Sequence, residues 1–127
     1  MQLQMQDSSL FLNLFRHKNG QLYAAKQTII EAGTVGTTMY VVLEGEVDIH
    51  AAGQQTVGGP GTIFGEMALI DDAPRSATVI AKTDCRLLEL DRRRFESLVS
   101  ETPYFALEVM HVMAERLRKT NARVTLA

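Results

Sequence analysis

The segment 64–79 carries the residues with the clearest chemical potential. Arg75 follows Pro74 at the entry to a β-rich run, and a guanidinium can bind a phosphate through two parallel hydrogen bonds. Residues 66–70 have the pattern of a single helical turn, whose first backbone N–H groups would form an anion site. Gly65, just before it, permits a close backbone approach or a positive φ. The segment therefore predicts a site for one small phosphate group.

Glu66 adds a different chemistry to this segment. A carboxylate beside a phosphate site suits the hydroxyl donors of a sugar better than a second phosphate. The alternative is that Glu66 and Arg75 form a salt bridge on a loop, where Gly65 only turns the chain. Charges on loops usually contribute little to stability or function. The residues alone leave both interpretations open.

The elements that must position these residues are short strands. Between about residues 20 and 90 the chain consists of short β-rich runs separated by glycines. Several short strands at close, regular spacing predict a barrel or a sandwich. The clearest runs are 27–30, 38–43, 46–50, 75–81 and 85–90.

Helix signals lie at both ends of the chain. Ser8 or Ser9 is a candidate cap for a short N-terminal helix. Asp91 is a candidate cap for a second helix, and Thr102 followed by Pro103 predicts the start of a longer one that runs to the chain end. The apolar residues of the first two helices are Phe11, Leu12, Leu14 and Phe15, then Phe95, Leu98 and Val99.

The last predicted helix has two apolar faces. Alternating steps of four and three residues are typical of a coiled-coil seam. One alternative is that this stripe packs on the chain's own β core, but a second apolar face is available for that role. The pattern favours a homodimer formed through the seam. The seam is Ala106, Met110, Met113, Leu117, Thr120 and Val124, and the second face is Phe105, Val109 and Val112.

The composition narrows the class of protein. The chain has 127 residues, is 46% hydrophobic and carries a net charge of −2. We expect one globular domain over residues 1–127, with no direct nucleic-acid binding. Cys85 is the single cysteine, which excludes an internal disulfide, and its apolar run predicts a buried strand position. No signal peptide or membrane-spanning segment is visible, so we expect a cytoplasmic chain without membrane contact.

The segment 64–79 resembles the phosphate-binding cassette of cyclic-nucleotide-binding domains, as found in catabolite activator protein, protein kinase A regulatory subunits and nucleotide-gated channels. Residues 31–33, Gly36 and residues 39–47 resemble the glycine-bounded strands of that family. The resemblance implies a mainly β fold. It would be an eight-stranded antiparallel, jelly-roll-like β-roll with an N-terminal helix, a short cassette helix and two C-terminal helices. The last of these, at about 103–127, would be a dimerisation and lid helix.

The resemblance also implies residue roles in the cassette, by which we mean residues 64–79. Arg75 would pair with the equatorial phosphate oxygens, and Glu66 would accept from the ribose 2′-hydroxyl. Gly65 and Ala68 would offer backbone contacts, and Ser76 a hydroxyl near the phosphate and base. The implied ligand residues are Gly65, Glu66, Met67, Ala68, Arg75, Ser76, Ala77, Thr120 and Asn121.

Recognition of the base would involve the last helix. Residues 116–124 resemble the dimerisation helix of catabolite activator protein, where a threonine–serine pair meets the adenine. Thr120 fills the threonine position, whereas Asn121 replaces the serine. An asparagine amide both donates and accepts hydrogen bonds, so it fits either purine edge. We expect cyclic AMP to be preferred, with cyclic GMP as the other candidate.

The resemblance implies a ligand sensor rather than an enzyme, with no cofactor or metal besides the cyclic nucleotide. Ligand binding would rearrange the C-terminal helix and so regulate a fused or partner effector. One alternative is an orphan or cyclic di-GMP-responsive dimerisation module of a transcription regulator. A cupin-like metal enzyme is a weaker alternative, because such enzymes need clustered ligands and His17, His50 and His111 are scattered.

Overall fold

The computed structural model describes residues 11, 13–15 and 17–126, and side chains as far as residue 119. Residues 11 and 13–15 are helical, as predicted for the N-terminal helix. The candidate caps Ser8 and Ser9, together with Leu12, lie outside the described residues.

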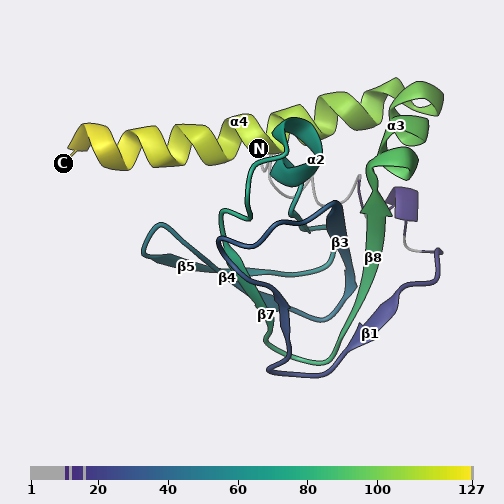
Figure 1. Cartoon of the computed structure of the whole chain (residues 1–127), viewed down its shortest axis with the longest axis horizontal. Helices are drawn as coiled ribbons and strands as arrows, with labels where there is room; N and C mark the ends of the chain where they lie inside the picture. Colours follow the sequence, from purple (N-terminus) through teal and green to yellow (C-terminus); the bar gives the residue numbers. More distant parts are fainter. Residues whose placement is uncertain (1–10, 12, 16, 127) are drawn as a thin grey trace. The chain divides into compact units, whose positions relative to one another are not determined.

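In the described part of the chain, eight strands form two four-stranded antiparallel sheets, and Figure 1 shows how most of these strands are arranged. The sheet orders are β1-β8-β3-β6 and β2-β7-β4-β5. This arrangement confirms the predicted eight-stranded β-roll. The strands are β1 (Gln21–Tyr23), β2 (Thr28–Ile30), β3 (Thr38–Glu44), β4 (Val47–Ala51), β5 (Gln54–Gly58), β6 (Ile63–Phe64), β7 (Thr78–Ala81) and β8 (Cys85–Asp91).

One strand starts later than predicted. The run 75–81 becomes β7 only from Thr78 onward, so Arg75 lies outside the regular ladder. Its backbone instead pairs with the loop after β2: the Arg75 N–H donates to the Thr34 carbonyl at 2.8 Å, and its carbonyl accepts from the Gly33 N–H at 2.8 Å. These two bonds anchor Arg75 in a fixed backbone position ahead of the strand.

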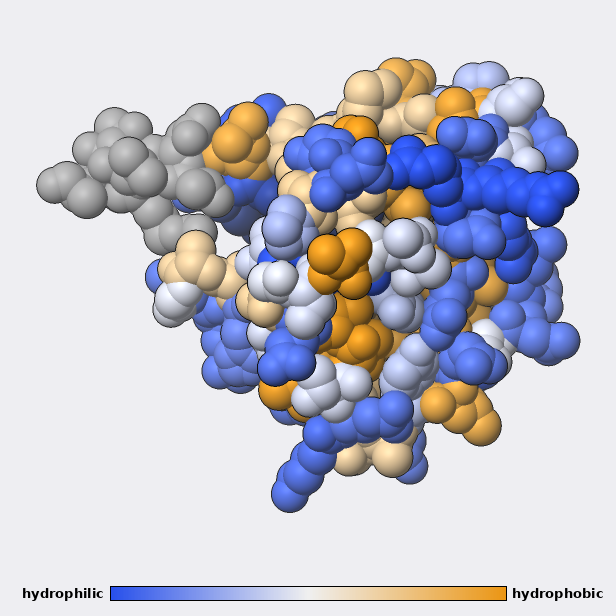
Figure 2. Space-filling view, viewed as in Figure 1, coloured by the Kyte–Doolittle hydropathy of each residue, from blue (hydrophilic) through white to orange (hydrophobic). Residues whose placement is uncertain are grey.

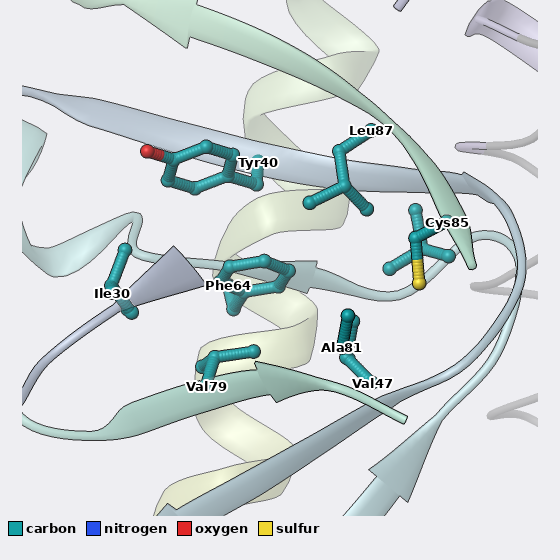
Figure 3. Close-up of a cluster of buried hydrophobic side chains, with 9 residues drawn as sticks. Ile30, Tyr40, Val47, Phe64, Val79, Ala81, Cys85 and Leu87 are labelled. Carbon is teal, nitrogen blue, oxygen red and sulfur yellow. The ribbon is translucent and has the colours of Figure 1, made fainter. Parts of the chain in front are cut away.

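The core lies between the two sheets. Figure 3 shows side chains from both sheets directed toward one another. The rings of Tyr40 and Phe64 are stacked, with centroids 5.0 Å apart. Cys85 is buried among these residues as predicted, and burial raises the pKa of its thiol. The cluster comprises Ile30, Tyr40, Val42, Val47, Phe64, Val79, Ala81, Cys85 and Leu87.

A polar pair ties β1 to β8. The Tyr23 hydroxyl donates to Glu89 Oε2 at 2.5 Å. Burial and the Glu89 carboxylate together raise the pKa of Tyr23 well above its usual range. Both effects favour the protonated phenol, which is the form that donates to Glu89.

Two helices follow the strands, α3 (Arg92–Glu101) and α4 (Pro103–Leu126). α4 begins at Pro103, as predicted, and the Thr102 carbonyl accepts from the Phe105 N–H at 2.8 Å. The rings of Phe95 and Phe105 meet edge to face at 5.6 Å. None of the helices among the described residues is long and apolar enough to cross a membrane.

The chain divides into two compact units, residues 1–92 and 93–127. The first holds both sheets and the cassette, and the second holds most of α3 and all of α4. On α4, the seam side chains Met110 and Leu117 are 55% and 60% exposed, whereas Phe105 and Val109 of the other face are buried. Ala106 and Met113 of the seam and Val112 of the other face are all half-buried, so the two predicted faces differ in exposure only in part.

Candidate functional site

The Arg75 side chain is buried and fixed by contacts from two separate segments. Its Nη1 donates to the Thr38 carbonyl at 2.7 Å and to the Gly65 carbonyl at 3.1 Å. Its Nη2 lies 3.4 Å from the Thr38 hydroxyl. The ring of Tyr40 is 5.9 Å from the guanidinium carbon, within cation–π range. Arg75 therefore has one defined orientation in the first compact unit.

The hydrogen bonds described for Arg75 do not neutralise its positive charge. The acceptors described for the guanidinium are two carbonyl oxygens and one hydroxyl, all neutral. A guanidinium also carries donors on Nε and a second N–H on Nη2. Within the described part of the chain no acceptor is assigned to them, so the cation retains the donors that a two-point contact with an oxyanion requires.

Two glycines make room for this guanidinium. A Cβ on Gly36 would lie 2.2 Å from Arg75 Nε and 2.3 Å from its Cζ. A Cβ on Gly65 would lie 2.8 Å from Nη1, and Gly65 also has a φ of +82°, which a larger residue rarely adopts. Both positions must stay free of side chains for Arg75 to keep its place.

Glu66 is the second charged residue of the site. It is 4% exposed and occupies the N-cap position of the short helix α2 (Met67–Asp71). In the described part of the chain, Glu66 and Arg75 are the charged side chains that are buried. Their burial argues against the alternative of an exposed salt bridge on a loop, because burying charge is costly unless specific interactions stabilise it.

The other predicted ligand residues are placed differently. Ala68 is buried within α2, and Met67, the first residue of α2, is half-buried. Ser76 is exposed and Ala77 is half-buried. Thr120 and Asn121 belong to α4, but their side chains lie outside the described residues, and α4 is in the second compact unit. Their roles therefore remain predictions.

A cavity of about 460 Å³ opens on one side of Arg75. Its size falls within the range of small-molecule sites. Figure 2 shows a narrow apolar area framed by hydrophilic side chains on the β-rich unit. The cavity shares Arg75 with the predicted ligand set. Its walls are Thr28, Ile29, Ile30, Glu31, Thr34, Val35, Tyr40 and Arg75.

Sequence reasoning missed the residues that hold Arg75. The sequence predicts Thr38 and Tyr40 only as strand residues, and Gly36 only as a glycine that bounds the strand. Thr38 lies 37 residues from Arg75 along the chain, so no local spacing pattern relates the two. The sequence offered one indication, the resemblance of Gly36 to a glycine of the family, but this resemblance did not assign Gly36 a function.

Comparisons with known proteins agree with this geometry. The family model for the cyclic nucleotide-binding domain matches residues 21–102, which include both sheets and the cassette. This chain belongs to the cyclic nucleotide-binding domain family. The family consists of ligand-binding regulatory domains. In the described part of this domain, no group of three His, Cys, Asp or Glu side chains has the arrangement of a metal site.

This cyclic nucleotide-binding domain is similar to several known proteins. The cyclic AMP receptor protein of Thermus thermophilus is 32% identical, over 95% of this chain and 57% of that protein. The cAMP-dependent protein kinase regulatory subunit of Aspergillus fumigatus is 42% identical, over 61% of this chain and 19% of its own length. The crystal structure of Thermus thermophilus catabolite activator protein superposes with a TM-score of 0.77 at 32% identity, covering 95% of this chain and 58% of that one. The chain thus spans little more than half the length of these bacterial relatives.

Replacing Gly36 by Ala tests the tight packing around Arg75. Because the clash falls on the end of a flexible side chain and not on backbone, the guanidinium should shift while the fold survives. We expect cyclic-nucleotide affinity to fall by about 1–3 kcal/mol, the scale of a lost hydrogen bond to a charged group. Calorimetric titration and a thermal melt measure the two effects.

Gly59→Ala is the matched control, since a Cβ there meets no atom within 4 Å. It should bind as the unaltered protein does. Equal affinities for the two variants would show that Gly36 does not position Arg75.

Proposed function

We propose that this chain is a cyclic-nucleotide sensor domain that prefers cyclic AMP. The observation that carries the proposal is the buried Arg75 guanidinium, fixed by the Thr38 and Gly65 carbonyls and retaining its positive charge. A fixed, partly desolvated cation favours a single phosphodiester, whose oxygens match the fork of the guanidinium. Membership of the cyclic nucleotide-binding family supports the same ligand class.

The other cassette residues complete the proposed binding site. Glu66, which is buried, accepts from the ribose 2′-hydroxyl, and a charged acceptor makes this a strong hydrogen bond. Gly65 and Ala68 bring backbone close to the ribose and phosphate, with Met67 between them. Ser76, which is exposed in this structure, supplies its hydroxyl near the phosphate and base, and Ala77 keeps the strand entry narrow.

The choice between purines lies outside the ribose-phosphate contacts, which are common to all cyclic nucleotides. It depends on Ser76, Thr120 and Asn121. The name of the Thermus relative, a cyclic AMP receptor protein, supports cyclic AMP as the preferred ligand. Cyclic GMP is the competing ligand, because the Asn121 amide can both donate and accept.

Ligand binding shifts the domain between two conformations. The chain acts as one ligand-responsive domain in which the helix at about 103–127 serves as lid and dimerisation element. Its exposed seam residues Met110 and Leu117 support pairing with a second copy. Ligand shifts the helix only through a difference in affinity for its two arrangements, and a fused or partner effector responds. The proposed role is regulatory and not catalytic.

Arg75→Leu tests the phosphate contact. We expect binding of cyclic AMP to weaken by roughly 2–5 kcal/mol, because the phosphate charge loses its partner in a buried site. Isothermal titration calorimetry measures this, and a melt checks the fold. Arg93→Leu, at an exposed position of α3, should leave the affinity unchanged. Unaltered cyclic AMP affinity in Arg75→Leu would refute the proposed site.

Leu117→Glu tests the seam. In a parallel pair of helices it places two like charges against each other, which should convert dimers into monomers. Light scattering across a concentration series, with and without cyclic AMP, reports the mass. A wild-type protein that stays monomeric at the highest concentration in both states would contradict the seam.

The double change Thr120→Ala with Asn121→Ala tests base recognition. Affinity should drop by only about 1–2 kcal/mol, the scale of one or two neutral hydrogen bonds. The preference for cyclic AMP over cyclic GMP should shrink, and so should the ligand-induced protection from hydrogen exchange along residues 116–123. If selectivity and protection both stay at wild-type levels, the helix does not read the base.

A further inference from the structure

Arg92 binds the far end of the short helix α2. Its Nη1 donates to the Leu69 carbonyl at 2.7 Å, and its Nη2 to Asp72 Oδ1 at 2.6 Å. Leu69 lies in the last turn of α2, where carbonyl oxygens have no N–H donor within the helix. Asp72 is the C-cap residue and has a φ of +58°. One guanidinium therefore satisfies the end of the helix and fixes its cap.

Arg92 also stands at a junction in the chain. It directly follows β8, is the first residue of α3 and is the last residue of the first compact unit. Its neighbour Asp91 pairs with Thr38 in the β3–β8 ladder. Thr38 is the residue whose carbonyl accepts from Arg75.

These contacts form a closed series of hydrogen bonds and chain connections that includes Arg75, Glu66, α2 and Arg92. Arg75 bonds Gly65, which leads through Glu66 into α2. The end of α2 bonds Arg92, and its neighbour Asp91 leads through the strand pairing back to Thr38 and Arg75. Within this series, the hydrogen bonds of Arg92 connect the C-terminal end of α2 to the end of β8.

We propose that Arg92 is a positioning residue that fastens the end of α2 to the start of α3, so that ligand contacts at Glu66 and Arg75 are linked to α3 through this guanidinium. The inference rests on the proposed function for its ligand. An α2 whose C-terminal end is held by Arg92 is partly ordered before the ligand arrives, which lowers the entropy cost of binding. Ligand that fixes the start of α2 in turn favours the conformation in which Arg92 is bound.

The fork geometry makes the identity of Arg92 important. The guanidinium reaches a carbonyl and a carboxylate at once, whereas a lysine ammonium is a point charge without the planar fork. An exposed ion pair alone would contribute little, and Asp72 is well exposed. The bond to the Leu69 carbonyl, which is part-buried, is the contact expected to matter more.

The test compares Arg92→Met with Arg93→Met in the full chain. Arg92→Met keeps the length of the stem and removes both hydrogen bonds, and Arg93 is an exposed neighbour on α3. Without ligand, amide exchange over residues 67–72 should speed up in Arg92→Met alone. Cyclic AMP affinity should fall roughly 5- to 30-fold, within the range of a lost hydrogen bond to a charged group. The ligand-induced change in exchange over residues 93–101 should shrink.

Further variants separate positioning from a general loss of structure. Arg92→Lys retains charge without the fork and should give an intermediate affinity and an unchanged melting temperature, so it decides the matter if Arg92→Met fails to fold. Asp72→Asn removes the ion pair but leaves the Leu69 contact, and should lower affinity less than Arg92→Met does. Wild-type affinity together with wild-type exchange in both Arg92 variants overturns the inference.

The proposed function and this inference fail in different ways. If the unaltered protein binds neither cyclic AMP nor cyclic GMP, the proposed function and the ligand linkage fall together. If it binds cyclic AMP while both Arg92 variants keep wild-type affinity and wild-type exchange of α2, only the role of Arg92 is overturned.

Discussion

The hydrogen bonds of the buried Arg75 guanidinium are the interaction on which the arrangement around the site depends. A cation in the interior needs acceptors, and here they are the carbonyls of Thr38, in β3, and Gly65, just after β6. β3 is paired with both β8 and β6, so the two acceptors are held in one sheet. The backbone of Arg75 is meanwhile fixed by the loop after β2. The position of the Arg75 guanidinium therefore depends on the pairing of the strands that carry its acceptors and on the glycines that leave it room.

The short helix α2 shows how strongly local structure depends on this constraint. A helix of five residues has little stability by itself in water. Ala68 and Leu69 are buried, and Arg92 satisfies the end of the helix, so α2 owes its order to tertiary contacts. Segments with low intrinsic stability are those that can respond to a ligand, because few contacts must change when they reorder.

Sequence reasoning succeeded where the information is local. The helix start at Pro103, the turn of helix after Glu66 and the run of β3 each depend on neighbouring residues, and the structure confirms them. β1 and β5 were not among the predicted runs, because most of their side chains are exposed and they lack a clear apolar pattern. The burial of Glu66 and the contacts of Arg75 with Thr38 depend on residues distant in the chain. The sequence therefore left a loop salt bridge open, and only the packed structure argues against it.

The long-range character of the Arg75 contacts has a consequence for folding. Thr38 and Arg75 are separated by 37 residues, and β3 gains its partner β8 only when the end of the β-rich region has been made. Contacts of this kind form late, because the loop-closure entropy must be overcome before they contribute. A partly synthesised chain that ends before β8 contains Arg75, Thr38 and Gly65 but lacks the β3–β8 pairing that holds Thr38 in the sheet. The proposed phosphate site is therefore complete only in the fully formed β-roll, so the fraction of chains able to bind the nucleotide is also a measure of how much of the population has finished folding.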